Sequence, residues 1–239
     1  MSELKQDHRI GSEDYIGRMN LEGGRGVYQG NRPKIDSIFN KAKPFLRAGM
    51  KAAEFGLGEG YLVRKLYDAH MEVTGLDLSG YLVQRLGDLT SQEGRKISFI
   101  QADIADKNGY PISDQDVFFC LDILEHITED EYKQALKNIH AALKPGGLFV
   151  GTVPNEENLA RSMVSCPNCG HEFHRIGHKQ RFDRSKLLDS LKDGFVVRRI
   201  GLVQTWTIND LGRRVKKAIR YPFKKYAPTD TIYFVAMKK

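Results

Sequence analysis

The spacing of apolar residues changes along the chain, and this change predicts alternating strands and helices. Short apolar runs or alternating apolar positions predict strands, whereas apolar residues three or four positions apart predict helices. The predicted strands are 51–54, 72–77, 96–101, 115–121, 148–153, 194–203 and 230–237. The predicted helices are 33–48, 61–69, 82–89, 129–143 and 182–191. Strands separated by helical patterns predict an α/β fold with a doubly wound, mostly parallel sheet.

A glycine-rich turn follows the first predicted strand. Glu54 ends this strand, and Gly56, Gly58 and Gly60 precede the next helical pattern. Glycine is needed where the backbone takes unusual dihedral angles or approaches a ligand, and such a ligand also meets the amino end of the following helix. A dinucleotide site would need the spacing G-x-G-x-x-G. That spacing is broken because Tyr61 follows Gly60.

A second acidic residue, Asp77, supports a nucleoside ligand. It ends the second predicted strand, and a carboxylate about 20 residues beyond the glycines can accept both ribose hydroxyls. With these residues the chain resembles the class I S-adenosylmethionine-dependent methyltransferases. The resemblance implies a Rossmann-like sheet of seven strands with the last strand antiparallel. It also implies that Glu54 and the glycines hold the amino-acid end of the cofactor, and that Asp77 holds its ribose.

A polar turn after the third predicted strand extends the resemblance. It implies that Asp103 hydrogen-bonds the adenine amino group and that Ile104 packs against the ring; an aspartate that only stabilises the turn is the alternative. The resemblance covers about residues 50–154. The complete set of expected cofactor-binding residues is Glu54, Gly56, Gly58, Gly60, Asp77, Leu78, Asp103, Ile104 and Leu121.

An acidic segment with a histidine follows the fourth predicted strand. In the family such a segment lies beside the sulfonium and the methyl acceptor, so the resemblance implies catalytic roles for Asp122, Glu125 and His126. A hydroxyl acceptor loses a proton as it attacks, and imidazole titrates near neutral pH, which makes His126 the candidate base. A structural role for His126 is equally open. Asp122 and Glu125 can instead position the cofactor or the acceptor.

A cysteine- and histidine-rich insertion follows the fifth predicted strand. Cys166 and Cys169 are spaced C-x2-C, and His174 and His178 are spaced H-x3-H. Thiolates and imidazoles at such spacings suit tetrahedral zinc, so these four residues are the predicted ligands of a structural zinc ion. His171 competes for one histidine place. The alternatives are a redox cysteine pair, for which the usual strand-to-helix turn is missing, or histidines that act as bases.

Length and composition indicate one domain with elaborations. The expected parts are an N-terminal arm at 1–32 and a methyltransferase-like domain at 33–239, with insertions at 155–182 and 207–227. Tyr28 and Arg32 are candidate lid residues, and an ordinary linker is the alternative. Hydrophobic residues make up 41% of the 239 residues, and neither a long apolar run nor a signal-peptide core is present. We therefore expect a cytoplasmic protein.

The formal net charge of +7 favours an anionic partner. Seven Lys and Arg residues lie within 208–226, where apolar residues recur at helical spacing. A basic amphipathic helix can contact an anionic membrane or a phosphate-bearing acceptor, or it can simply be half-buried with a solvated face. Aromatic residues among these charges are sparse, which makes nucleic acid a less favoured partner.

These observations favour an S-adenosylmethionine-dependent methyltransferase that methylates a hydroxyl of a small molecule, such as a sugar, a lipid-linked intermediate or a secondary metabolite. Methylation of RNA or protein is the second hypothesis, motivated by the positive charge. A non-catalytic cofactor-binding scaffold is the third. The Asn-Pro-Pro-Tyr motif of many amino-group methyltransferases that act on nucleic acids is missing, because the segment 153–155 follows the wrong strand.

Overall fold

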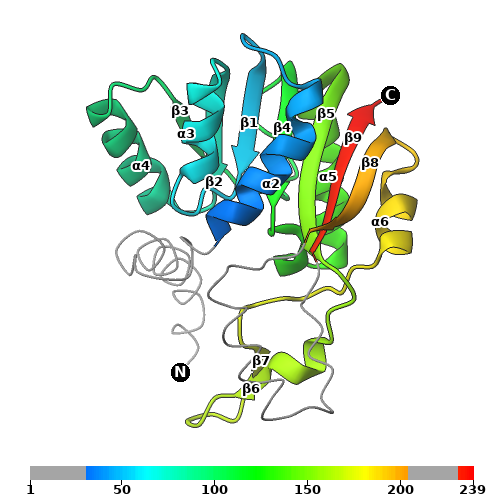
Figure 1. The fold of residues 1–239 in the computed structure, drawn as a ribbon. Coiled ribbons are helices and arrows are strands. Elements are labelled where there is room, and N and C mark those ends of the chain that lie inside the picture. Colours follow the sequence, from blue (N-terminus) through cyan, green and yellow to red (C-terminus); the bar gives the residue numbers. More distant parts are fainter. Residues whose placement is uncertain (1–30, 204–230) are drawn as a thin grey trace, which may run out of the picture.

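A twisted sheet with helices on both faces forms the centre of the computed structural model, which describes residues 31–203 and 231–239 (Figure 1). Its strands are β1 (Lys51–Phe55), β2 (Glu72–Asp77), β3 (Ser98–Gln101), β4 (Gln115–Leu121), β5 (Leu143–Pro154), β8 (Phe195–Val203) and β9 (Thr231–Lys238). The seven strands lie in the order β3-β2-β1-β4-β5-β9-β8. β9 is antiparallel to both β5 and β8, and the other neighbouring pairs are parallel. The predicted mostly parallel sheet with an antiparallel last strand is confirmed.

The helices cover the two faces of the sheet. They are α2 (Arg32–Ala42), α3 (Tyr61–Asp68), α4 (Gly80–Gln92), α5 (Glu129–Ala142) and α6 (Arg184–Leu191). Leu62 of α3 and Val117 of β4 belong to one hydrophobic cluster, which also includes α2 and α4. Tyr132 of α5 and Phe118 of β4 belong to the other cluster, together with α6. Successive side chains of a strand point to opposite faces of the sheet. Since Val117 and Phe118 are both buried, β4 is covered on both faces.

Local sequence explains where several helices begin and end. α2 stops at Ala42, before the predicted end at residue 48, because Pro44 has no N–H to continue the helical hydrogen bonds. The chain continues as the short 3-10 helix η2 (Lys43–Phe45). Ser79 caps α4, since its hydroxyl accepts a hydrogen bond from the N–H of Leu82 at 3.2 Å.

The insertion between β5 and α6 contains a small antiparallel hairpin. A 3-10 helix, η4 (Leu159–Ser162), leads into β6 (Met163–Ser165), which pairs with β7 (Glu172–His174). Figure 1 shows this hairpin beyond the edge of the sheet at which β1 and β4 end. The insertion therefore lies at the carboxyl edge, where parallel α/β sheets bind their ligands.

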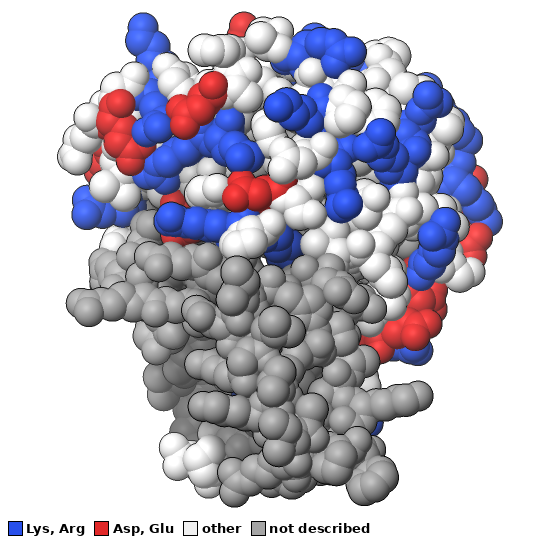
Figure 2. Space-filling view, viewed as in Figure 1, with Lys and Arg blue, Asp and Glu red and all other residues white. Residues whose placement is uncertain are grey.

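Two predictions fall outside the described residues, namely the lid role of Tyr28 and the basic helix at 208–226. Figure 2 shows Lys and Arg side chains spread over the upper part of one face, with Asp and Glu among them. Several described cations are paired with acids, for example Arg64 with Glu93 and Arg95 with Asp68. In the described part of the chain, no helix has both the length and the apolar character needed to cross a membrane.

Candidate active site

The glycine turn between β1 and α3 needs glycine for its backbone. Gly56, Gly58 and Gly60 have φ values of 87°, 51° and 73°, a region that residues with a side chain rarely adopt. Gly56 also has no room for a side chain, because a Cβ there would lie 2.3 Å from Cδ1 of Ile123. Ile123 belongs to the segment after β4. The glycine turn therefore lies against this segment, residues 122–126, which is called the reaction segment below because it holds the candidate catalytic residues.

Two carboxyl groups lie beside this turn, the buried Glu54 near the end of β1 and the half-buried Asp77 at the end of β2. Glu54 is 4% exposed, and its Oε2 atom has no hydrogen-bond partner among the described residues. Burial raises the pKa of Glu54 well above its usual value, and the nearby charge of Asp77 adds to the shift. Asp77 accepts hydrogen bonds from the N–H groups of Leu57 at 2.8 Å and Ser79 at 2.9 Å. Burial raises the pKa of Asp77 as well, although these bonds oppose the shift.

The residues expected to contact adenine differ in their exposure. Leu78 is 38% exposed and follows Asp77 directly. Asp103 is exposed, and its Oδ1 accepts the N–H of Ala105 at 2.8 Å, a contact that stabilises the turn. Ile104 is only 3% exposed and packs in the hydrophobic core. Leu121, at the end of β4, is half-buried. Adenine contacts by Asp103 and Ile104 stay predictions.

Asp122 connects three elements at this edge of the sheet. Its φ of 55° is unusual for a residue other than glycine, and such backbone strain is concentrated at functional sites. The hydroxyl of Thr152 donates to its Oδ1 at 2.8 Å, and Lys34 of α2 forms an ion pair with the other carboxylate oxygen. Arg32, a predicted lid residue, makes two hydrogen bonds of 2.6 and 2.9 Å to Glu59 in the glycine turn. The first turn of α2 is thus attached both to Asp122, which follows β4, and to Glu59 in the glycine turn.

Glu125 and His126 lie in the 3-10 helix η3 (Leu124–His126). Glu125 is 1% exposed, and burial, together with the nearby charge of Asp122, raises its pKa well above the usual value. Burial, reinforced by nearby His178, lowers the pKa of His126 to about 4. His126 is therefore neutral at neutral pH. It can accept a proton, but this pKa makes it a weak base.

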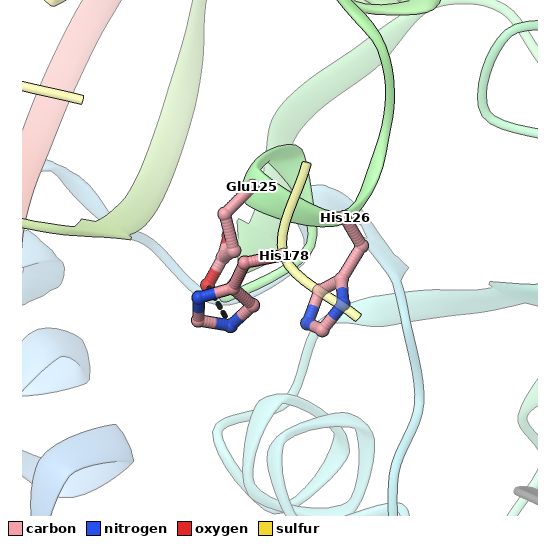
Figure 3. Close-up of side chains that lie close together, drawn as sticks. All are labelled: Glu125, His126 and His178. Atoms are coloured by element: carbon pink, nitrogen blue, oxygen red, sulfur yellow. Dashed lines mark ion pairs between the residues drawn. The ribbon is translucent and has the colours of Figure 1, made fainter. Parts of the chain in front are cut away.

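The end of the insertion returns to η3 and completes the site. Figure 3 shows the His178 side chain beside Glu125 and His126, and its Nε2 lies 4.0 Å from Oε1 of Glu125. The N–H of Lys179 donates to the Glu125 carbonyl at 2.7 Å. The buried amide of Gln180 donates to two further backbone carbonyls of this segment. The sequence analysis did not place His178 or Gln180 here, and no local pattern indicates the contact of Gln180.

The four predicted zinc ligands form two pairs. Cys166 and Cys169 lie in the turn of the β6–β7 hairpin; backbone hydrogen bonds and a hydrogen bond with the Cys169 thiol lower the pKa of Cys166. The rings of His174 and His178 stack with centroids 4.9 Å apart. The described residues close enough to share an ion form two groups: Glu125, His126 and His178, and Glu157, His174 and His178. Neither group includes a cysteine or His171. The structure therefore does not assemble the four predicted ligands, and zinc bound to them stays a prediction.

Comparison with known proteins places the glycine turn and the reaction segment in one family. Residues 52–147 match the family model described as a methyltransferase domain. These residues therefore carry a methyltransferase domain. Over 144 residues it is 28% identical to the ubiquinone biosynthesis O-methyltransferase of Vibrio vulnificus. This match covers 59% of the chain and 60% of that relative, less than two thirds of its length.

Solved structures share the fold of this methyltransferase domain. The [4+2]-cyclase SpnF matches with a TM-score of 0.64 and 21% identity, over 90% of this chain and 83% of that one. The N-methyltransferase NodS from Bradyrhizobium japonicum, solved with S-adenosylhomocysteine, matches with a TM-score of 0.62 and 15% identity, over 87% of each chain. Identities at this level establish the fold of the domain and leave its reaction to be argued from the site.

Proposed function

We propose that the protein transfers the methyl group of S-adenosylmethionine to a hydroxyl oxygen of a small molecule. The observation that carries the proposal is the contact between Gly56 and Ile123, which joins the glycine turn to the segment with Asp122, Glu125 and His126. The cofactor supplies a methyl group on a cationic sulfur, so the protein mainly has to align this group with the acceptor. The relatives named ubiquinone biosynthesis O-methyltransferases support an oxygen acceptor.

The residues of the glycine turn fit the proposed cofactor. The buried Oε2 of Glu54, which has no hydrogen-bond partner among the described residues, and the glycine backbone of the turn suit the amino-acid end of S-adenosylmethionine. Each carboxylate oxygen can accept more than one hydrogen bond. Asp77 therefore keeps acceptor capacity for the ribose hydroxyls, although it already accepts the backbone N–H groups of Leu57, Leu78 and Ser79. Leu78 offers exposed apolar surface next to this position.

The segment after β4 fits the acceptor side of the reaction. Asp122 is fixed by Thr152 and Lys34, so it can orient a polar group of the acceptor. The acceptor hydroxyl loses a proton as the new C–O bond forms, and neutral His126 can receive it. Because its pKa is about 4, His126 serves this role only weakly unless another group makes the hydroxyl more acidic.

The experiment is transfer of isotope-labelled methyl from S-adenosylmethionine to a panel of small phenols, catechols and sugars, with RNA and protein in parallel. We expect label on a hydroxyl oxygen of a small molecule, and loss of the label in Asp77→Ala. Transfer to RNA alone, falling steeply with salt, would favour the RNA hypothesis. Cofactor binding without transfer to any acceptor would favour a scaffold.

A further inference from the structure

Glu125, His126 and His178 surround a common point at the reaction edge, although they come from two distant segments (Figure 3). One potential ligand atom of each residue lies within 4.8 Å of the others. The Oε2 of Glu125 is buried and has no hydrogen-bond partner among the described residues. A buried, unpartnered carboxylate oxygen is unfavourable unless another group binds it. We propose that these three residues bind a divalent transition-metal ion, with zinc as the best-suited ion.

The contacts of His178 leave the correct nitrogen free for an ion. Its Nδ1 contacts Oε2 of Glu157 in a short hydrogen bond. A carboxylate accepts, so Nδ1 carries the proton and Nε2 has a free lone pair. That Nε2 faces Glu125 at 4.0 Å. Histidines that bind metals usually donate their other N–H to a carboxylate or a carbonyl, and Glu157 supplies this carboxylate.

His126 has the same arrangement with a backbone carbonyl. Its ring makes a hydrogen bond with the backbone of Gly177 that favours the charged imidazole, so a ring N–H donates to the Gly177 carbonyl. A Cβ at Gly177 would lie 3.5 Å from Nδ1 of His126, which places the two residues in contact. The other ring nitrogen is left as an acceptor. Both histidines are therefore oriented as metal ligands by groups outside the ligand set.

The neighbouring group of Glu157, His174 and His178 fits an ion less well. The Nδ1 of His174 accepts the backbone N–H of His178 at 3.1 Å. In a neutral imidazole the proton must then be on Nε2, the nitrogen that faces Glu157 at 3.7 Å. His174 therefore has no free lone pair toward this group. Its ring instead stacks on His178 and helps to hold that residue at the ion.

Two imidazoles and one carboxylate suit zinc and similar ions of intermediate softness. Three protein ligands leave a coordination position for water or for an acceptor oxygen. A bound ion would lower the pKa of a coordinated hydroxyl, so that the hydroxyl could release its proton to water before its oxygen attacks the methyl group. This consequence rests on the proposed function. In this arrangement the lone pair of His126 is bound to the ion, so His126 is a metal ligand and the reaction does not use it as the base.

The test is calorimetric titration of metal-free protein with zinc chloride, without cofactor or acceptor. We expect wild-type protein to bind zinc, and Glu125→Gln and His126→Asn each to weaken binding by at least about 10-fold, since even outer residues change metal affinity this much. The double variant Cys166→Ser/Cys169→Ser should keep this site. No zinc binding by wild type would overturn the proposal, as would binding that the cysteine variant loses and Glu125→Gln retains.

Cobalt(II) in place of zinc identifies the ligand atoms. Thiolate-bound cobalt has an intense near-ultraviolet charge-transfer absorption, which nitrogen and oxygen ligands do not produce. In the Cys166→Ser/Cys169→Ser background we expect visible cobalt absorption, and we expect the addition of Glu125→Gln to abolish it. Unchanged absorption would overturn the proposed ligand set.

A matched control separates metal loss from misfolding. Glu125→Gln keeps the shape of the side chain, so its circular dichroism should equal that of wild type. The proposed function and the metal site can also fail separately. Zinc binding without methyl transfer would contradict only the function, and methyl transfer by protein that binds no zinc would contradict only the metal site.

Discussion

The carboxyl edge of the sheet has two halves that are built in different ways. The glycine half consists of the turn at 56–60 with Glu54 and Asp77. Its positions are set by backbone dihedral angles and by bonds between consecutive elements. The histidine half consists of 122–126 and the returning insertion. Its contacts join residues far apart in sequence, such as Gln180 and Ile127, which are 53 positions apart.

This difference has a physical consequence for each half. The glycine half has a shape that the backbone imposes, so it is expected to be rigid before any ligand binds. The histidine half gathers buried ionisable side chains, and their pKa values move far from the usual range. Such groups are stable together only when a proton, a ligand or an ion balances their burial. The four predictions below test this division.

The largest expected effect is that of Gly56→Ala, which places a methyl group in the contact between the two halves. We expect the free energy of unfolding to fall by about 3 kcal/mol, because the new Cβ adds left-handed backbone strain and a clash with Ile123. Urea unfolding followed by circular dichroism measures this loss. Gly94→Ala is the matched control, since Gly94 also has positive φ but has nothing within 4 Å of its Cβ. It should lose only about 1 kcal/mol, and equal losses would contradict a steric contact.

The next effect concerns the glycine half alone. Asp77→Ala should weaken S-adenosylmethionine binding by roughly 10- to 100-fold, because the ribose hydroxyls lose a charged acceptor. Calorimetry measures the affinity, and thermal unfolding checks that the variant folds. Glu72→Ala removes an exposed carboxylate at the opposite end of the same strand and should bind like wild type. Unchanged affinity in Asp77→Ala would remove this residue from the cofactor site.

A smaller effect concerns the histidine half of the metal-free protein and its dependence on pH. The pKa of His126 is about 4 in the folded protein, below the ordinary 6.5, so the unfolded chain binds more protons between these values. Neutral His126 therefore contributes to the free energy of unfolding above pH 6.5. This contribution, on the order of 1–2 kcal/mol for a partly accessible group, is lost as the pH falls toward 4. The free energy of unfolding of His126→Gln should change less between pH 6.5 and pH 4 than that of wild type. The raised pKa of Glu125 acts in the opposite direction in both proteins, so the difference between them isolates His126.

The smallest effect concerns α2. Arg32→Ala removes the ion pair with Glu59. Because the Arg32 side chain is 46% exposed, the free energy of unfolding should fall by less than about 1 kcal/mol. Thermal unfolding at low and high salt measures it, and the difference from wild type should shrink at high salt. Arg95→Ala, an arginine paired with Asp68 away from the site, is the control. A loss of several kcal/mol in Arg32→Ala alone would show that α2 is anchored mainly by this pair.

The glycine half could be predicted because its features are local. Three glycines after a strand, an acid at the next strand end and alternating apolar patterns are all readable in short windows of sequence. The sheet and the need for glycine at 56–60 follow from them. The predicted end of α2 at residue 48 was wrong because apolar residues continue at helical spacing beyond Pro44, whereas the proline ends the helix at Ala42.

The histidine half could be predicted only in part. Glu125 and His126 were predicted at this edge because the segment after the fourth strand resembles the one that lies beside the methyl acceptor in the family. Cys166 and Cys169 lie in the turn of the β6–β7 hairpin, and their spacing does not determine where the chain goes next. His178 was therefore grouped with the cysteines, whereas the tertiary path brings it to Glu125 and Glu157. Contacts between distant side chains depend on that path, which no short pattern encodes.

Calorimetric titration of wild-type protein with S-adenosylmethionine, and separately with NAD, tests most directly the claim that the glycine half is the cofactor site. We predict micromolar binding of S-adenosylmethionine and no binding of NAD. Binding of NAD alone, or of neither compound, would contradict this assignment of the glycine turn, and the proposed methyl transfer would fall with it.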